Sequence, residues 1–178
     1  TIFTDGAVLA DVLLNATTSP QVVNYEFEAI ANGCINPVTI IENVTVIPSA
    51  DMTVTNNSPF FCSDGFTNIE LTSSTAGAVI ELISTNTTPD ALGVSGITAI
   101  NTTWNSFPST IGDNLINSTN ATQTVEYIFE VSAGGFTNPV TQSVFVEVRP
   151  LPDVAAIAPG ICSDDVTNVD IWNPNGVN

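Results

Sequence analysis

The 178 residues carry 18 acidic side chains against one Arg, Arg149, and no Lys or His, so the formal net charge is −17. This charge argues against binding to nucleic acid or to anionic lipid, because both need Lys and Arg to replace counterions. Val, Ile and Thr are frequent, no window has sustained helical periodicity, and no apolar run is long enough to cross a membrane, which together predict an all-β chain.

Residues 1–48 hold only the second half of a β-rich unit. We predict a short strand at 12–14 and two longer strands at 21–31 and 38–47. Pro48 ends the last strand because it has no backbone N–H to continue a ladder.

Residues 49–150 hold a complete unit, for which we predict seven strands, the number of an immunoglobulin-like sandwich. The segment 59–65 is expected to be a turn region, and 85–95 a polar loop. The first strand should lie at a sheet edge. The first five strands are expected at 52–55, 67–71, 78–84, 96–104 and 113–119.

The last two strands of this unit have the clearest pattern. Apolar residues alternate with Glu126 and Glu130 in the first strand and with Glu147 and Arg149 in the second. This predicts an antiparallel hairpin with one buried face and a turn wider than two residues, which contains Gly134-Gly135 and Asn138-Pro139. The expected core of the unit is Ile69, Leu71, Ile80, Leu82, Leu115, Tyr127, Phe129, Val144 and Val146.

Residues 151–178 begin a third unit and end after its second strand. The linkers 49–51 and 151–153 are equivalent and short, so neighbouring units should be closely coupled. The sequence has no signal peptide and both of its ends fall inside a unit, so we expect it to be part of a longer polypeptide.

A shift of 102 positions brings the first unit onto the second without a gap. Tyr25 then matches Tyr127, Phe27 matches Phe129, and 36–39 matches 138–141 as Asn-Pro-Val-Thr. A further echo at a shift of 100 relates 62–64 to 162–164, both Cys-Ser-Asp. These matches predict tandem antiparallel β-sandwich repeats of about 100 residues.

The chain resembles a known repeat family through two features. One is Tyr-x-Phe-x-x-x-Ala-x-Gly-Cys followed by a Val-rich strand that ends in Pro, and the other is Ile-Cys-Ser followed by Thr-Asn. The family comprises the PKD-like, immunoglobulin-like repeats of giant Bacteroidota cell-surface adhesins, among them the SprB-type gliding-motility adhesins. The resemblance covers nearly the whole chain. It implies type IX secretion, an extracellular location at the cell surface and a role as a long surface filament.

The cysteines depart from this family at one position. The Gly-Cys position of the family is Cys34 in the first unit but Phe136 in the second, so no disulfide can use it there. We also expect no Cys34–Cys62 bond, because a strand of roughly 30 Å and then a linker separate the two residues. We expect instead that Cys34 pairs with a cysteine upstream of residue 1 and Cys162 with one beyond Asn178. Cys62 is expected to stay free.

No catalytic, cofactor-binding or metal-binding residue is assigned. Without His or Lys there is no Ser-His-Asp, Cys-His or Ser-Lys arrangement, and three scattered Cys do not form a zinc site. A carboxylate pair could hydrolyse a glycoside, but the acids fall mostly on the outer faces of the predicted strands. Ca²⁺ binding by carboxylates is conceivable, although no Asp-x-Asp-x-Asp loop supports it. The acids on outer strand faces are Glu70, Glu81, Glu126, Glu130 and Glu147.

Aromatic residues near the predicted turns have two interpretations. Trp104, Phe107, Phe60 and Phe61 either pack against the core or line a surface for sugars or for a neighbouring unit, and packing is favoured. Seven Asn-x-Ser/Thr sequences could accept glycans, at Asn15, Asn43, Asn56, Asn86, Asn101, Asn117 and Asn120.

Two functions from different classes remain open at this point. The leading hypothesis is a structural stalk segment of a large secreted adhesin, whose partners are neighbouring repeats, surface polysaccharide or other surface proteins. The alternative is an accessory carbohydrate-binding or spacer module of a secreted polysaccharide-degrading enzyme. The chain itself is not expected to be an enzyme.

Overall fold

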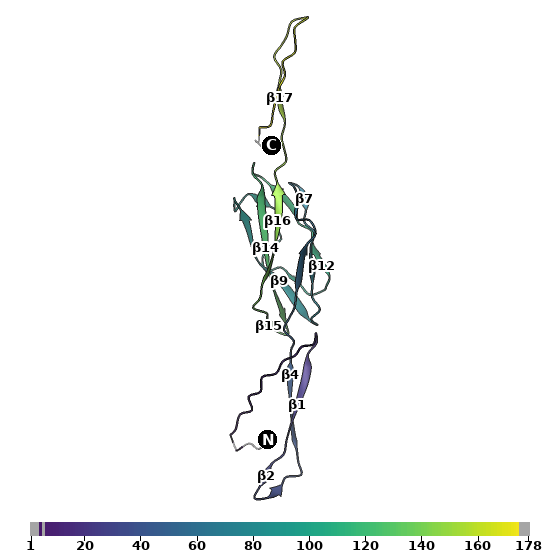
Figure 1. Ribbon diagram of the computed structural model, residues 1–178, viewed down its shortest axis with the longest axis vertical. Helices are drawn as coiled ribbons and strands as arrows, with labels where there is room; N and C mark the ends of the chain where they lie inside the picture. Colours follow the sequence, from purple (N-terminus) through teal and green to yellow (C-terminus); the bar gives the residue numbers. More distant parts are fainter. Residues whose placement is uncertain (1–3, 5, 175–178) are drawn as a thin grey trace.

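The computed structural model describes residues 4 and 6–174, and these residues form strands and no helix. The molecule is long and narrow, with three parts in a row (Figure 1). We call them the N-terminal part (residues 4–48), the middle sandwich (49–150) and the C-terminal hairpin (151–174). The all-β class predicted from composition is confirmed.

The N-terminal part contains four strands in two small antiparallel ladders, β1 with β4 and β2 with β3. The strands are β1 (Gln21–Phe27), β2 (Ile30–Ala31), β3 (Cys34–Ile35) and β4 (Ile40–Val46). The C-terminal hairpin contains one antiparallel pair, β17 (Ala155–Ile157) and β18 (Asp170–Trp172).

The middle sandwich holds the remaining strands. They are β5 (Thr53–Asn56), β6 (Phe60–Cys62), β7 (Gly65–Phe66), β8 (Ile69–Thr72), β9 (Ala78–Thr88), β10 (Val94–Ser95), β11 (Thr103–Trp104), β12 (Ser109–Ile111), β13 (Asn114–Asn117), β14 (Gln123–Ala133), β15 (Phe136–Thr137) and β16 (Gln142–Arg149). One sheet has the order β11-β9-β14-β16-β6, with β15 attached to β14. Two three-stranded sheets, β12-β8-β5 and β10-β13-β7, complete the fold.

The core of the middle sandwich is formed by alternate residues of its strands. Along β14 every second residue from Gln123 to Ala133 is buried, which is the period of a strand with one face in a core. Eight of the nine expected core residues are buried. The ninth, Val144, is half-buried because β16 begins at the rim, where Gln142 bonds to Met52 and Val54 of the edge segment.

Several strand predictions for the middle sandwich need correction. It contains twelve strand segments rather than seven, and 59–65 is not a simple turn because it holds β6 and the start of β7. The pair β6–β16 is parallel, so the fold is not wholly antiparallel. The predicted strand at 96–104 is reduced to β11, since Gly96 has a φ of +89° and lies where a Cβ would meet the Asn114 carbonyl oxygen.

One further prediction is wrong, and one is confirmed with a detail added. The segment 12–14 forms no strand; its counterpart β13 pairs with β7 and β10, whose counterparts at the 102-residue shift would precede Thr1. The connection between β14 and β16 is wider than two residues, as predicted, since their ladder ends at Phe129 and Gln142. Within it, Ala133 pairs with Phe136 across a tight two-residue turn at Gly134 and Gly135. Both glycines have positive φ, as a type I′ turn requires.

The N-terminal part repeats the local geometry of the middle sandwich. Gln21 pairs with Val46 as Gln123 pairs with Val148, and all seven pairs of β1 with β4 recur between β14 and β16 at a shift of 102. The turn between β2 and β3 has the same pairing as that between β14 and β15, with positive φ at Asn32 and Gly33.

The side-chain hydrogen bonds recur with the ladders. Asn15 Nδ2 donates to Val46 O at 2.7 Å, and Asn117 Nδ2 donates to Val148 O at 2.8 Å. Both amide groups also hold the turn that follows them, through bonds with Thr17 in one case and Thr119 in the other. Sequence similarity and local structure therefore follow the same 102-residue shift.

Candidate functional site: the junction groove

The glutamates considered for acid–base chemistry lie on partly exposed outer faces of strands. Glu81 and Glu130 are direct partners across β9 and β14, so two like charges stand opposite each other. Both side chains are half-exposed, and neither lines the groove described below. Among the described residues, no group of three His, Cys, Asp or Glu is placed to hold a metal ion.

The four aromatic residues near predicted turns, which were expected either to pack in the core or to line a binding surface, do not form one surface. Trp104, Phe107 and Phe61 pack against the core, and the Trp104 ring meets Phe129 edge-on at 6.2 Å. Phe60 is exposed, and the Arg149 guanidinium lies 4.5 Å from its ring centroid. Trp104 on β11 and Phe60 on β6 stand at opposite edges of the large sheet, so they cannot contact one ligand together.

The three cysteines are free and exposed, and Cys34 and Cys62 are not bonded to each other. Cys34 begins β3, next to the β2–β3 turn at the far end of the N-terminal part (Figure 1). Cys62 ends β6, which pairs with the C-terminal end of β16. Their separation follows from the extended course of the chain.

The N-terminal part contacts the middle sandwich at the linker between them. Ile47 packs against the core of the sandwich, and a Cβ on Gly134 would come within 2.5 Å of Ile47 Cδ1. Pro48 and Ala50 are buried, and Asn138 Nδ2 donates to Ala50 O at 2.7 Å. Residues 48–50, at the first of the two linkers, are thus held against the turn that follows β14.

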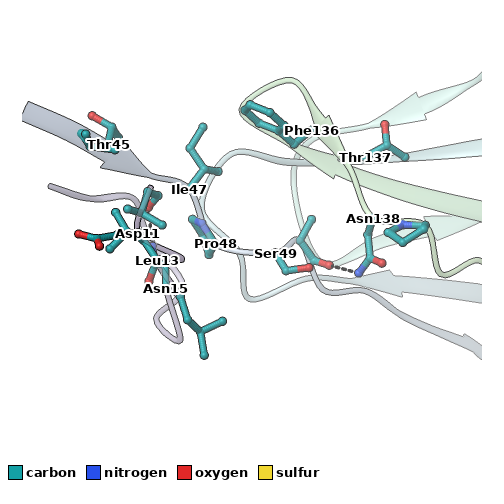
Figure 2. Close-up of a pocket in the computed structure, with 15 residues that line it drawn as sticks. Asp11, Leu13, Asn15, Thr45, Ile47, Pro48, Ser49, Phe136, Thr137 and Asn138 are labelled. Atoms are coloured by element: carbon teal, nitrogen blue, oxygen red, sulfur yellow. Dashed lines mark hydrogen bonds between the residues drawn. The ribbon is translucent and has the colours of Figure 1, made fainter. Parts of the chain in front are cut away.

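A groove of about 520 Å³ opens beside this linker (Figure 2). The coil at 11–15 and the end of β4 form one wall, and the β15 turn forms the other. We call it the junction groove. Its lining is Asp11, Leu13, Leu14, Asn15, Val44, Thr45, Val46, Ile47, Pro48, Ser49, Ala50, Phe136, Thr137, Asn138 and Pro139.

Asp51, the last residue of the linker, anchors it to the loop that follows β8. Partial burial would raise the pKa of the Asp51 carboxyl, but hydrogen bonds from Thr75, Ser74 and Ser73 outweigh this and hold the pKa well below its usual range. The Asp51 amide in turn donates to Thr75 Oγ1 at 3.0 Å. The carboxylate stabilises the start of the sandwich and needs no cation to balance it.

A second acidic residue is used inside the sandwich. Tyr127 OH donates to Asp113 Oδ2 at 2.8 Å, and the backbone N–H of Thr98 donates to the same oxygen. Burial and then the neighbouring Asp113 carboxylate raise the pKa of the Tyr127 phenol. This pair recurs as Tyr25 with Asp11 at 3.0 Å, so the contact belongs to the fold in both places.

Sequence reasoning missed Ile47, Gly134 and Asn138 as contact residues. Their sequence pattern indicates only that Gly134 and Asn138 belong to the turn between the last two strands. One signal was available: Asn32 stands where Gly134 stands in the next unit, so the turn itself does not demand Gly. The Gly at 134 instead leaves room for Ile47.

Within residues 6–174 no helix exists that could span a membrane. A scan against models of known protein families and a search of curated protein sequences both find no match.

Proposed function

We propose that this chain is a stalk segment of a large, repetitive, secreted cell-surface adhesin, built from tandem immunoglobulin-like or PKD-like sandwich repeats with boundaries near 48/49 and 150/151. Its work is mechanical: it extends away from a surface and transmits load between whatever the two ends hold.

One observation carries this proposal. The strand register, the tight turn and the Asn and Tyr hydrogen bonds all recur at a shift of 102 residues, and the linker between the two occurrences is buried. A spacer that only separates two domains has no need of a buried linker. A stalk does, because stiffness at each junction keeps a long array extended.

The direction of the strands also suits a load-bearing role. The long strands β14 and β16 run along the length of the molecule, as do β1 and β4 (Figure 1). A force applied along this axis loads many ladder hydrogen bonds at the same time rather than one after another. The net charge of −17 keeps such a surface hydrated and discourages neighbouring filaments from sticking.

The second candidate, a carbohydrate-binding module, is favoured by one surface. Phe60 and Phe145 are both exposed, and they lie on adjacent strands, since Phe60 pairs with Glu147 two residues after Phe145. Arg149 stands over the Phe60 ring. Aromatic rings with a nearby polar group can stack on sugar rings. If this candidate is right, Phe60→Ala and Phe145→Ala should each remove binding to a polysaccharide panel.

Surface labelling of the producing cells separates the two candidates. Antibody against residues 49–150 should label intact cells and detect a surface polypeptide of many repeat lengths. A short polypeptide with an adjoining catalytic domain would contradict the stalk proposal and favour the binding module.

A further inference from the structure

The segments that enter and leave the middle sandwich run side by side in the same direction. Residues 50–63 follow the first linker, and residues 138–149 precede the second. The residue numbers of the bonded groups rise together along both segments, so the pairing is parallel. We call these hydrogen bonds the parallel seam. They join Asn138 to Ala50, Gln142 to Met52 and Val54, Asn56 to Phe145, Pro59 to Glu147, and Ser63 to Arg149.

At its C-terminal end the seam is a backbone ladder. β6 pairs with β16 in parallel, with Phe61 opposite Val148. Glu147 N donates to Pro59 O at 2.9 Å, and Ser63 N donates to Arg149 O at 2.7 Å. These bonds join the two backbones directly, as in any parallel pair of strands.

At its N-terminal end the seam is made by side-chain amides instead. β5 belongs to the β12-β8-β5 sheet, whereas β16 belongs to the large sheet. Gln142 Oε1 accepts from Val54 N at 3.1 Å, and Gln142 Nε2 donates to Met52 O at 2.8 Å. One amide side chain thus offers β5 the acceptor and the donor that a neighbouring peptide group would offer. Asn56 bridges in the other direction, since its Nδ2 donates to Phe145 O at 2.7 Å.

The ladder between β14 and β16 does not itself require Gln at position 142. Gln142 pairs there with Phe129. At the 102-residue shift, Ile40 pairs with Phe27 in the same register. A side chain without polar atoms therefore supports the same ladder, and the amide of Gln142 is used for its two bonds to the entering segment.

The seam lies between the two points at which the rest of the chain is attached to the sandwich. The N-terminal part joins it next to residue 50, and the C-terminal hairpin joins it next to residue 149, at the opposite end (Figure 1). A pull along the molecule therefore moves the two parallel segments lengthwise past each other. All bonds of the seam are loaded at the same time, whereas bonds that are loaded from one end break one after another.

We propose that the parallel seam sets the force at which the middle sandwich unfolds, and that Gln142 and Asn56 extend it with side-chain bonds in place of ladder bonds. The rest of the sandwich keeps its structure until the seam breaks. This inference deepens the proposed stalk function and rests on it for its biological use. Resistance to force is a property of the fold, so it is measured separately from cell-surface location.

Two attachment geometries on the full chain test the direction of loading. In the first, Cys34, Cys62 and Cys162 are replaced by Ser, and handles are attached through Ser49→Cys and Leu151→Cys, which loads the seam lengthwise. In the second, Cys62 is kept and handles are attached through it and Leu151→Cys, which opens the seam from one end. The three attachment positions are exposed. Single-molecule force spectroscopy should give a higher unfolding force in the first geometry at the same loading rate.

Two glutamine variants test the side-chain bonds in the first geometry. Gln142→Ile removes both bonds to the entering segment and should unfold about fivefold faster or more at a fixed force. Gln123→Ile is the matched control, because the Gln123 amide accepts from Asp90 N and donates to Thr119 Oγ1, both at 2.9 Å and outside the seam. It should unfold under force at the rate of the parent, since these bonds are intact when the seam breaks. Urea unfolding should nevertheless show a loss of stability for Gln123→Ile, whose side chain is buried.

Equal forces in the two geometries, or a higher force in the second, would overturn the proposal whatever the variants do. So would an unchanged unfolding rate of Gln142→Ile under force, or an equal acceleration by Gln123→Ile. If Gln142→Ile does not fold, Asn56→Ala removes the bond to Phe145 O and carries the same expectation. Failure of the surface labelling would count against the stalk and leave the seam standing, whereas failure of the force measurements would do the reverse.

Discussion

Residues 11–48 and 113–150 form the same local structure in two different surroundings. The two parts share the seven ladder pairs, the tight turn, the Tyr–Asp bond and the hydrogen bonds of Asn15 and Asn117, which we call the Asn clamp. Burial is not shared: Phe129 and Val146 are fully buried, whereas Phe27 is 37% and Val44 42% exposed. Register and turns thus follow from local sequence, while burial of the same positions depends on the strands that pack against them.

The largest expected difference between the two regions concerns the aromatic core. Phe129→Ala should lower the free energy of unfolding of the middle sandwich by about 3–5 kcal/mol, because a buried ring leaves a cavity. Phe27→Ala should have little effect on the same transition, since its ring is not enclosed. Urea unfolding followed by Trp104 fluorescence measures both. Equal losses would mean that Phe27 belongs to the same cooperative core.

The Asn clamp should give a smaller difference of the same kind. Asn117 is buried and bonds to Ala121 O and Val148 O, so Asn117→Ala should cost about 1–3 kcal/mol by leaving buried groups unpaired. Asn15 makes the equivalent bonds near solvent, where water can replace them. Its Ala variant should be within about 0.5 kcal/mol of the parent. Thermal unfolding of both variants checks the comparison.

At the junction, the N-terminal part already has Asn at the turn position that Gly134 occupies in the middle sandwich. Asn32 holds at φ 52° the turn position that Gly134 holds at 58°, so Gly134→Asn should keep the turn. Any loss then comes from contact with Ile47, and we expect about 1–2 kcal/mol. The same substitution in an Ile47→Ala background should be nearly silent. If it is not, strain in the turn rather than the junction contact is the cause.

The smallest expected effect on stability concerns Asp51 and its contribution at low pH. The lowered pKa of Asp51 means that its carboxylate stabilises the fold above the unfolded pKa of about 3.9, and that this contribution is lost as the pH falls below it. Asp51→Asn should therefore show a flatter decline in melting temperature between neutral pH and acid than the parent. Identical slopes would show that the bonds from Ser74 and Thr75 do not favour the ionised form.

The sequence was sufficient for what depends on local pattern. Alternation in β14 identified its buried face, and the 102-residue shift identified the shared register of β1 with β4. It failed where the partner is remote in sequence. The parallel pairing of β6 with β16 joins residues more than eighty positions apart, and Pro59, Gly65 and the polar Ser63-Asp64 gave only a turn signal.

The junction groove was missed for the same reason. Its walls come from 11–15, β4 and the β15 turn, and no single stretch of sequence has the pattern of a groove. Gly134 was interpreted through its backbone freedom alone. Only the structure shows that the missing side chain also makes room for Ile47.

Residue-level amide hydrogen exchange, measured at concentrations where the chain is monomeric, tests the shared but differently covered structure most directly. β14 pairs with β9 on one side and β16 on the other, whereas β1 pairs with β4 alone. The comparison predicts protection of consecutive amides from 124 to 129 and of only alternate amides from 22 to 27. Continuous protection along β1 would mean that its second edge is also paired, and would contradict the single ladder of β1 with β4.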